Sequence, residues 1–356
     1  MAIPDHPHTL PLDGYTLDQV LTLRVRPEHS SKLPPTIQVQ VRQLHTRTLS
    51  CTMVVDPVGE VQSPNVENTV FLKLFDRRFA EQLRQDNGIE KWTRAMEEAY
   101  LDAVKSGAIC SFLHDLHEIP KYKDDTEEDW DDAQNEAFLA DELHGLYKTE
   151  VAVYNALNQY QGRLIPTLLA AVELDIAPAK PDIHPSAQDL EPCKVRGILL
   201  QYIPGHSMKH LPDHFPRSSW QDIVDQALLV VNVLGDHSIL NRDVRPENFL
   251  ISKKTEVDIS RYQVFMIDFA LCRFRGRDES DLEWGRAKHT KDEEGAIALR
   301  MKKLLEKEHG FDLQYQDSMR YAKWADTEDN FHHNAVRTEL RPGVVVYSLA
   351  KPKSTE

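Results

Sequence analysis

ILNRDVRPENFLI, at residues 239–251, is the stretch that decides the fold, and VFMIDFA follows it at residues 264–270. Asp243 is followed five positions later by Asn248, and the second run carries a further carboxylate, Asp268. In phosphoryl transfer, one carboxylate receives or orients the proton of the attacking hydroxyl, while an amide and another carboxylate hold Mg²⁺. An Asp and an Asn between two apolar strands can instead form an ordinary loop with local side-chain caps. The two runs together, in this order, favour a site for phosphoryl transfer.

The two runs closely resemble the catalytic loop of protein kinases, H-R-D-L-x-x-x-N, and the metal-binding D-F-G that follows it. The resemblance implies that Asp243 acts as catalytic base with Arg245 beside it. It also implies that Asn248 and Asp268 hold Mg²⁺ and that ATP is the phosphoryl donor. The sequence departs from the kinase pattern at four positions, which are Asn241 for His, Val244 for Leu, Arg245 for the usual Lys, and Ala270 for Gly.

A lysine lies inside an apolar run that is predicted to be a strand, Val-Phe-Leu-Lys-Leu at residues 70–74. A kinase uses such a lysine on its third strand to hold the α- and β-phosphates, so the resemblance assigns this role to Lys73. A lysine at the surface of an edge strand, with its stem packed on apolar neighbours, is the alternative.

A helix is predicted from residue 142 to about residue 157, because apolar residues recur there at intervals of three and four. In the kinase fold, the helix that follows the third strand carries a glutamate that pairs with the strand lysine. Glu150 is the first candidate for that glutamate and Glu142 is the second. A surface glutamate that pairs only within its own helix is the alternative.

The first part of the chain is predicted to form an antiparallel sheet from strands near residues 20–25, 37–42, 50–55 and 70–75. Further strands are expected at residues 168–175 and 195–203. The last of these resembles a kinase hinge, which implies Leu200 at the back of an adenine pocket and backbone bonds from Gln201 and Ile203 to the base. Residues 42–50 contain no glycine, so the glycine-rich phosphate loop of kinases is missing.

Residues 77–140 are expected to form a mostly helical, acidic insertion. Its densest acidic run, residues 124–132, is predicted to be a solvated, partly disordered loop. A docking surface for a basic protein partner, with Trp130 as its anchor, is the alternative for this run.

The chain has 356 residues, a net charge of −15 and four widely spaced cysteines. This balance argues against nucleic acid or an anionic membrane as the main partner. The cysteines are typical of reduced, incidental thiols. No signal peptide and no membrane-spanning run is recognised, so a soluble intracellular protein, cytoplasmic or nuclear, is expected.

Taken together, the motifs resemble the protein-kinase-like superfamily from about residue 37 to residue 300, and several phrases resemble protein-kinase-like proteins of filamentous fungi. The implied fold is α+β and two-lobed, with a β-rich small lobe at residues 1–204 and an abbreviated helical large lobe at residues 205–356. A guess from order alone places Asp292 as the buried acid that braces the catalytic loop.

Two functions remain open from the sequence. The first is an ATP-dependent phosphotransferase that acts on a hydroxyl of an unidentified protein or small molecule. The second is a pseudokinase or scaffold that binds nucleotide weakly or not at all and acts through protein–protein contacts. The complete set of charged groups favours the enzyme, whereas the missing glycines and the short large lobe favour the scaffold.

Overall fold

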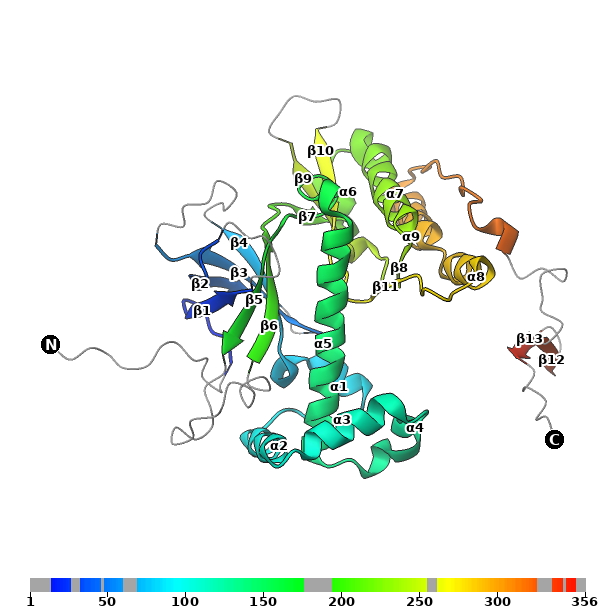
Figure 1. Cartoon of the computed structure of the whole chain (residues 1–356). Coiled ribbons are helices and arrows are strands. Elements are labelled where there is room, and N and C mark those ends of the chain that lie inside the picture. The colour runs from blue at the N-terminus through cyan, green and yellow to red at the C-terminus, as the bar shows by residue number, and fades with distance from the viewer. Residues whose placement is uncertain are drawn as a thin grey trace. The chain divides into compact units, whose positions relative to one another are not determined.

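A computed structural model describes residues 14–26, 33–45, 48–59, 69–175, 194–254, 261–324, 335–341 and 344–349 (Figure 1). The chain divides into two compact units. The first contains the described residues up to 214 together with 247–272, and the second contains 215–246 and the described residues from 273 onward. The chain is α+β, as predicted: a six-stranded antiparallel barrel comes first, and a helical region with small sheets follows.

The barrel of the first unit is a closed antiparallel sheet in which the last strand pairs back to the first. Its strands, in spatial order, are β1 (Val20–Val25), β2 (Thr36–Leu44), β3 (Cys51–Pro57), β4 (Val70–Phe75), β6 (Lys194–Gln201) and β5 (Leu168–Asp175). All six strands lie where the sequence predicted them, because each combines β-branched residues with an alternating pattern. The alternation sends every second side chain into a packed interior, which includes Leu21, Val39, Met53, Val55, Leu72 and Val172.

The face of β4 that points away from the barrel interior is also covered. Val70, Leu72 and Leu74 fill the barrel, and the residues between them therefore point to the other face. On that face Lys73 is only 4% exposed and Phe75 only 6% exposed. This face of β4 is the wall on which the candidate site is built.

The long helix α5 (Asp132–Ala156) contacts β4 and β6 within the first unit and stands beside the barrel in Figure 1. The predicted helix began at residue 142, so its start was wrong by ten residues. The helix begins earlier because Asp131 and Gln134 form a reciprocal capping box at its first turn. Ala133, Ala137, Phe138 and Leu139 then continue the buried stripe upstream of the predicted start.

The insertion is helical, as predicted, and packs around the first turns of α5 (Figure 1). Its elements are η1 (Arg77–Phe79), α1 (Glu81–Asp86), α2 (Arg94–Ser106), α3 (Ala108–Glu118), α4 (Tyr122–Thr126) and η2 (Glu127–Asp129). Four buried charged side chains join it to α5. The Glu136 carboxylate of α5 accepts from Arg77 and from Arg84 at 2.5 Å, and Arg77 also donates to Glu97 at 2.7 Å.

The acidic run 124–132 corrects a prediction, because it is ordered by local contacts. It forms the end of α4, the whole of η2 and the N-cap of α5. The Trp130 ring lies 5.0 Å from the Phe112 ring and 5.5 Å from the Phe138 ring, and its indole N–H donates to Thr126 at 3.0 Å. Trp130 thus packs into the insertion, where it is half-buried, and a basic partner at this run stays a prediction.

A three-stranded sheet completes the first unit, with β9 (Phe249–Lys253) between β10 (Tyr262–Met266) and β7 (His206–Ser207). The turn η5 (Met208–His210) and the short helix α6 (Leu211–His214) follow β7, and η7 (Pro246–Asn248) leads into β9. The antiparallel register pairs Phe249 with Met266, so the residues just outside this pair meet at one end of the hairpin.

The second unit is mainly helical. Its helices are α7 (Trp220–Asp236), α8 (Asp281–Lys291) and α9 (Glu293–His309), with the shorter elements η6 (Arg217–Ser219), β8 (Ile239–Asn241), β11 (Cys272–Phe274), η8 (Ala322–Trp324), β12 (Ala335–Arg341) and β13 (Val344–Leu349). Apolar residues recur at helical spacing along residues 219–234 and 292–308, and these stretches form α7 and α9. Across the described residues, no helix combines the length and the apolar character needed to span a membrane.

Candidate functional site

The β9–β10 hairpin brings two of the predicted metal ligands to one end. Asn248 directly precedes β9, and Asp268 lies two residues after β10. The backbone N–H of Ile267 donates to the carbonyl of Asn248 at 2.9 Å, which continues the ladder by one pair. Asp268 itself has a left-handed backbone with φ of 65°, which is uncommon outside glycine and clusters at functional positions.

Lys73 lies between two carboxylates. Its ammonium is 2.6 Å from Glu150 Oε2 and 2.8 Å from Asp268 Oδ1, so β4, α5 and the β9–β10 hairpin meet at one charge. Glu150 therefore makes the ion pair expected from the sequence, whereas Glu142, the second candidate, is exposed on α5. Burial alone would lower the pKa of Lys73, but the charges of Asp268 and Glu150 and the hydrogen bonds to them raise it above its ordinary value.

Exposure distinguishes the two carboxylates. The side chains of Lys73 and Glu150 are 5% and 1% exposed, whereas that of Asp268 is 39% exposed. Glu150 is thus a buried partner that holds the lysine. Asp268 remains open to solvent and to a ligand.

The three charges lie in a cavity of about 430 Å³ within the first unit, which we call the barrel cavity. This volume falls in the range of cavities that hold small molecules and cofactors. The antiparallel register pairs Phe71 of β4 with Leu200 of β6, and these side chains line the cavity with Ile203 and Leu250. The cavity combines apolar walls with a group of three charges.

The end of β6 and the segment that follows it form one edge of the barrel cavity and contain the three residues expected to hold a base. Leu200, Gln201 and Ile203 all line the cavity, as does Gly205. The backbone N–H of Gln201 donates to the Thr167 carbonyl at 2.9 Å, so this amide is already used inside the protein. Within the described residues, neither backbone group of Ile203 has a hydrogen-bond partner, so both can serve a ligand.

Gly205 is needed where the chain leaves this edge. A Cβ at that position would lie 2.2 Å from the carbonyl oxygen of Ile251, closer than any real contact. Glycine therefore lets the chain pass close to β9.

Polar residues of the β2–β3 connection and of the strand ends beside it line the barrel cavity, where a glycine-rich loop was missing from the sequence. They are Gln43, His45, Thr48, Ser50 and Thr52. Thr52 is paired with Lys73 in the β3–β4 register and so lies beside the lysine on the neighbouring strand. Burial lowers the pKa of His45, which favours the neutral ring beside Phe71. Hydroxyl and amide side chains, in place of glycine backbone, are available here to an anionic ligand.

The predicted base lies in the second unit and is held by its own loop. The Asp243 carboxylate is 3.1 Å from the Arg245 guanidinium, with 24% of the Asp243 side chain exposed. Its backbone N–H donates to the Asn241 side chain at 2.7 Å. Asn241, which replaces the histidine of the kinase pattern, is fully buried and fixes this turn.

The acid that braces this loop is Glu293, one residue after the predicted Asp292. Glu293 accepts from the backbone N–H of Asn241 at 2.8 Å and pairs with the buried Lys288, whose ammonium also donates to the Ile239 carbonyl at 3.1 Å. Asp292 caps helix α9 by accepting from the Gly295 amide at 3.0 Å. The prediction for Asp292 was therefore wrong, because its side chain serves the helix end.

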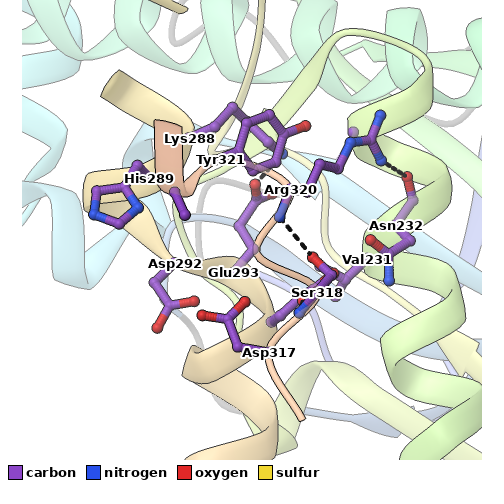
Figure 2. Close-up of a pocket in the computed structure, with 13 residues that line it drawn as sticks. Val231, Asn232, Lys288, His289, Asp292, Glu293, Asp317, Ser318, Arg320 and Tyr321 are labelled. Atoms are coloured by element: carbon purple, nitrogen blue, oxygen red, sulfur yellow. Dashed lines mark hydrogen bonds and ion pairs between the residues drawn. The ribbon is translucent and has the colours of Figure 1, made fainter. Parts of the chain in front are cut away.

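Figure 2 shows the ion pair of Lys288 and Glu293, which we call the brace, at a cavity of about 230 Å³ inside the second unit. The Tyr321 ring lies beside Lys288, with 5.5 Å between the ammonium and the ring centroid. Arg320 donates to the carbonyl of Asn232 at 3.4 Å, which attaches this segment to α7. Lys288 and Glu293 were not predicted from the sequence, because a lysine and a glutamate five residues apart across a helix boundary give no recognisable motif.

The two residues at the hairpin end that were predicted to hold Mg²⁺, Asn248 and Asp268, both carry oxygen donors. Among the described residues, no group of three or more His, Cys, Asp or Glu side chains could hold an ion. Asn248 and Asp268 offer an amide and a carboxylate, oxygen donors of the kind that Mg²⁺ accepts when phosphates and water complete its shell. Asp268 lines the barrel cavity, whereas Asn248 is buried and is not part of the lining.

No protein-family model matches the sequence, and no curated protein matches it.

Proposed function

We propose that the protein is an ATP-dependent phosphotransferase of the protein-kinase-like type, and that the barrel cavity is its nucleotide site. The observation that carries the proposal is Lys73, buried between Glu150 and Asp268 in a cavity with apolar walls. In this proposal the barrel and its insertion, up to about residue 204, correspond to a small lobe, and the chain from residue 205 onward corresponds to a shortened large lobe.

The nucleotide would be held by groups of different chemistry. Leu200, Ile203 and Leu250 offer apolar surface to a base, and the Lys73 ammonium offers a charge to the α- and β-phosphates. Asn248 and Asp268 would hold Mg²⁺, which neutralises charge on the phosphates when bound. Glu150 keeps the lysine in place through the 2.6 Å ion pair.

Asp243 is the proposed base that accepts or orients the proton of the acceptor hydroxyl. Its carboxylate is positioned by Arg245, and its backbone by Asn241 and the Lys288–Glu293 brace. A carboxylate that is fixed yet partly exposed can meet a substrate hydroxyl without first breaking a buried contact. The acceptor, a protein or a small molecule, is the part of the substrate that the proposal leaves open.

Thermal unfolding with ATP and Mg²⁺ tests the nucleotide site. At a concentration about 100 times the dissociation constant, a ligand that binds only the folded state adds about 2.7 kcal/mol to stability. Mg²⁺–ATP should therefore raise the melting temperature of the wild type, and Asp268→Asn should remove most of the rise. Asp213→Asn, an exposed carboxylate outside the cavity, is the matched control and should retain it.

Asp243→Asn separates the enzyme from a scaffold. Loss of a positioned acid–base group costs about 10²–10⁴ in rate, whereas Mg²⁺–ATP binding should stay close to that of the wild type. Radiolabelled ATP turnover measures the rate, and the melting shift measures binding. No shift in the wild type at millimolar ATP would refute the nucleotide site. Binding without turnover in any assay, and with Asp243→Asn fully active in cells, would instead support the pseudokinase alternative.

A further inference from the structure

Three polar side chains form a row across adjacent strands on the cavity side of the barrel. The register pairs Thr52 of β3 with Lys73 of β4, and the backbone N–H of His45, directly after β2, donates to the Thr52 carbonyl at 3.0 Å. His45, Thr52 and Lys73 all line the barrel cavity, and we call them the cross-strand row. Neighbouring strands lie about 4.8 Å apart, so the row extends over about 10 Å.

Hydrogen-bonding groups without a partner inside the protein lie along this row. Ser50 is only 4% exposed and lines the barrel cavity, yet within the described residues its hydroxyl has no hydrogen-bond partner. The Thr52 hydroxyl and the two ring nitrogens of His45 are equally unpartnered in this part of the chain. An unmade hydrogen bond at a buried group costs free energy, so a wall that keeps several such groups is suited to a polar ligand.

The row contains one permanent charge. Lys73 is the only lysine or arginine in the described lining of the barrel cavity, and its ammonium is already shared by Glu150 at 2.6 Å and Asp268 at 2.8 Å. A chain of phosphates along the row would meet this ammonium at one end and the Thr52 hydroxyl in the middle. At the other end it would meet His45, which becomes a second cation when its ring is protonated.

We propose that the cross-strand row binds the phosphates of the nucleotide and that His45 takes up a proton when they bind. This inference rests on the proposed function and adds to it a dependence of nucleotide affinity on pH. A neutral imidazole has one N–H donor, whereas the protonated ring has two. Hydrogen bonds from a charged donor to phosphate oxygens are shorter and stronger than those from a neutral donor. Affinity for Mg²⁺–ATP should therefore rise as the pH falls.

The surroundings of His45 keep its ring neutral before a ligand binds. Burial lowers its pKa, and no charge of the described residues contributes to this change. Thr52 of β3 and the Phe71 ring of β4, 5.7 Å from the imidazole, face it and carry no charge. A phosphate beside the ring would raise the pKa, typically by about 1 or more. The titratable groups that share the described lining with His45 are Lys73, Glu150 and Asp268.

The sign of the effect follows from these two states. The pKa of His45 is higher in the complex than in the free protein, so the added affinity is complete below the free value and is lost as the pH rises through the bound value. With a rise of about 1, Mg²⁺–ATP should bind about five times more tightly at pH 6 than at pH 8.

Isothermal titration calorimetry of the full chain with Mg²⁺–ATP at pH 6, 7 and 8 tests the coupling. Titrations at pH 7 in buffers of different ionisation enthalpy measure the protons taken up on binding. His45→Asn should show less proton uptake and a weaker dependence on pH than the wild type. His114→Asn, which changes an exposed histidine of α3 outside the cavity, is the matched control and should behave as the wild type does.

Thr52→Val tests the middle of the row, because it keeps the shape of the side chain and removes the hydroxyl. It should weaken binding of Mg²⁺–ATP and of Mg²⁺–tripolyphosphate about tenfold, since a hydrogen bond to a charged group is lost, and leave binding of adenosine unchanged. An equal loss for adenosine and tripolyphosphate would indicate a structural role and would overturn the proposal.

Two other outcomes are decisive. A wild type that binds Mg²⁺–ATP with the same proton uptake and pH dependence as His45→Asn, or with the same affinity as Thr52→Val, would overturn this inference and leave the proposed function standing. A wild type that binds no Mg²⁺–ATP at millimolar concentration would refute the proposed function and this inference with it.

Discussion

Replacing Lys73 with methionine should make the stability of the protein depend more steeply on pH, between pH 5 and pH 8, than that of the wild type. Methionine has a similar length and removes only the ammonium. Glu150, whose side chain is 1% exposed, then keeps a buried carboxylate without its partner. The more exposed Asp268 can be hydrated, so most of the cost falls on Glu150.

The size and sign of the effect follow from burial. Removing one member of a buried ion pair typically costs about 3–5 kcal/mol. The variant can escape that cost by protonating Glu150, because burial raises the pKa of this carboxyl. An unfolded glutamate titrates near 4.3, and stability falls by about 1.36 kcal/mol per pH unit while only the unfolded state is ionised. The cost should therefore be small near pH 4.5 and reach about 3–4 kcal/mol by pH 7.

In the wild type this loss is smaller, because the Lys73 ammonium opposes the rise that burial gives to the pKa of Glu150, and the lysine stays charged up to alkaline pH because its own pKa is raised. Its contribution is complete below its ordinary pKa and is lost only as the pH rises through the folded-state value. The two proteins should therefore diverge steadily from pH 5 to pH 8.

Urea denaturation at pH 5, 6, 7 and 8 measures the divergence. The double variant Lys73→Met with Glu150→Gln is the matched control, since it keeps the shape of the pair and removes both charges. It should show little pH dependence and be more stable at pH 8 than Lys73→Met. A cost that is constant across the four pH values, or a double variant no more stable than the single one, would refute the buried ion pair as the source.

Two further predictions concern other parts of the chain. Glu293→Gln should destabilise the protein by about 3–5 kcal/mol in urea denaturation, because it leaves the buried Lys288 without its carboxylate partner. Asp292→Ala removes a helix cap and should cost about 1 kcal/mol. Equal costs for the two variants would contradict the assignment of Glu293 as the acid that braces the loop. His144→Gln should reduce the loss of stability that occurs as the pH falls from 6.5 to about 4. In this range the pKa of His144 is lowered by folding, so the unfolded chain binds a proton at this residue and the folded chain does not. Identical pH profiles of wild type and variant in urea denaturation would argue against this contribution.

Local patterns in the sequence were enough to predict the elements that carry the candidate site. Alternation located β4 within its exact bounds, and the apolar run that ends at Ile267 placed Asp268 just after a strand. Helical spacing predicted the helix, and the resemblance to kinases then favoured Glu150 over Glu142, although residues 77–140 separate Glu150 from the strand lysine. The structure shows that Lys73 and Glu150 are paired, and their roles in catalysis remain proposals.

The features that the sequence did not reveal depend on single side-chain contacts. The capping box at Asp131 set the start of α5, and no periodicity contains that information. Trp130 and its aromatic neighbours ordered an acidic run that composition alone described as a solvated loop. The exchange of Asp292 for Glu293 depends on which of two adjacent acids faces the loop: Asp292 is the left-handed N-cap of α9, with φ of 44°, and Glu293 is the first residue of the helix.

The position of α5 is fixed by buried charges at both ends of its barrel-facing stripe. Glu136 binds the insertion through Arg77 and Arg84, and Glu150 binds β4 through Lys73. The two glutamates are 14 residues apart, close to four helical turns and about 21 Å along the axis, so they lie on nearly the same face. A slide of α5 by one residue would turn both carboxylates away from their partners and leave them buried without a counter-charge. The insertion therefore helps to fix the position of α5 along the barrel, and this position places Glu150 against Lys73.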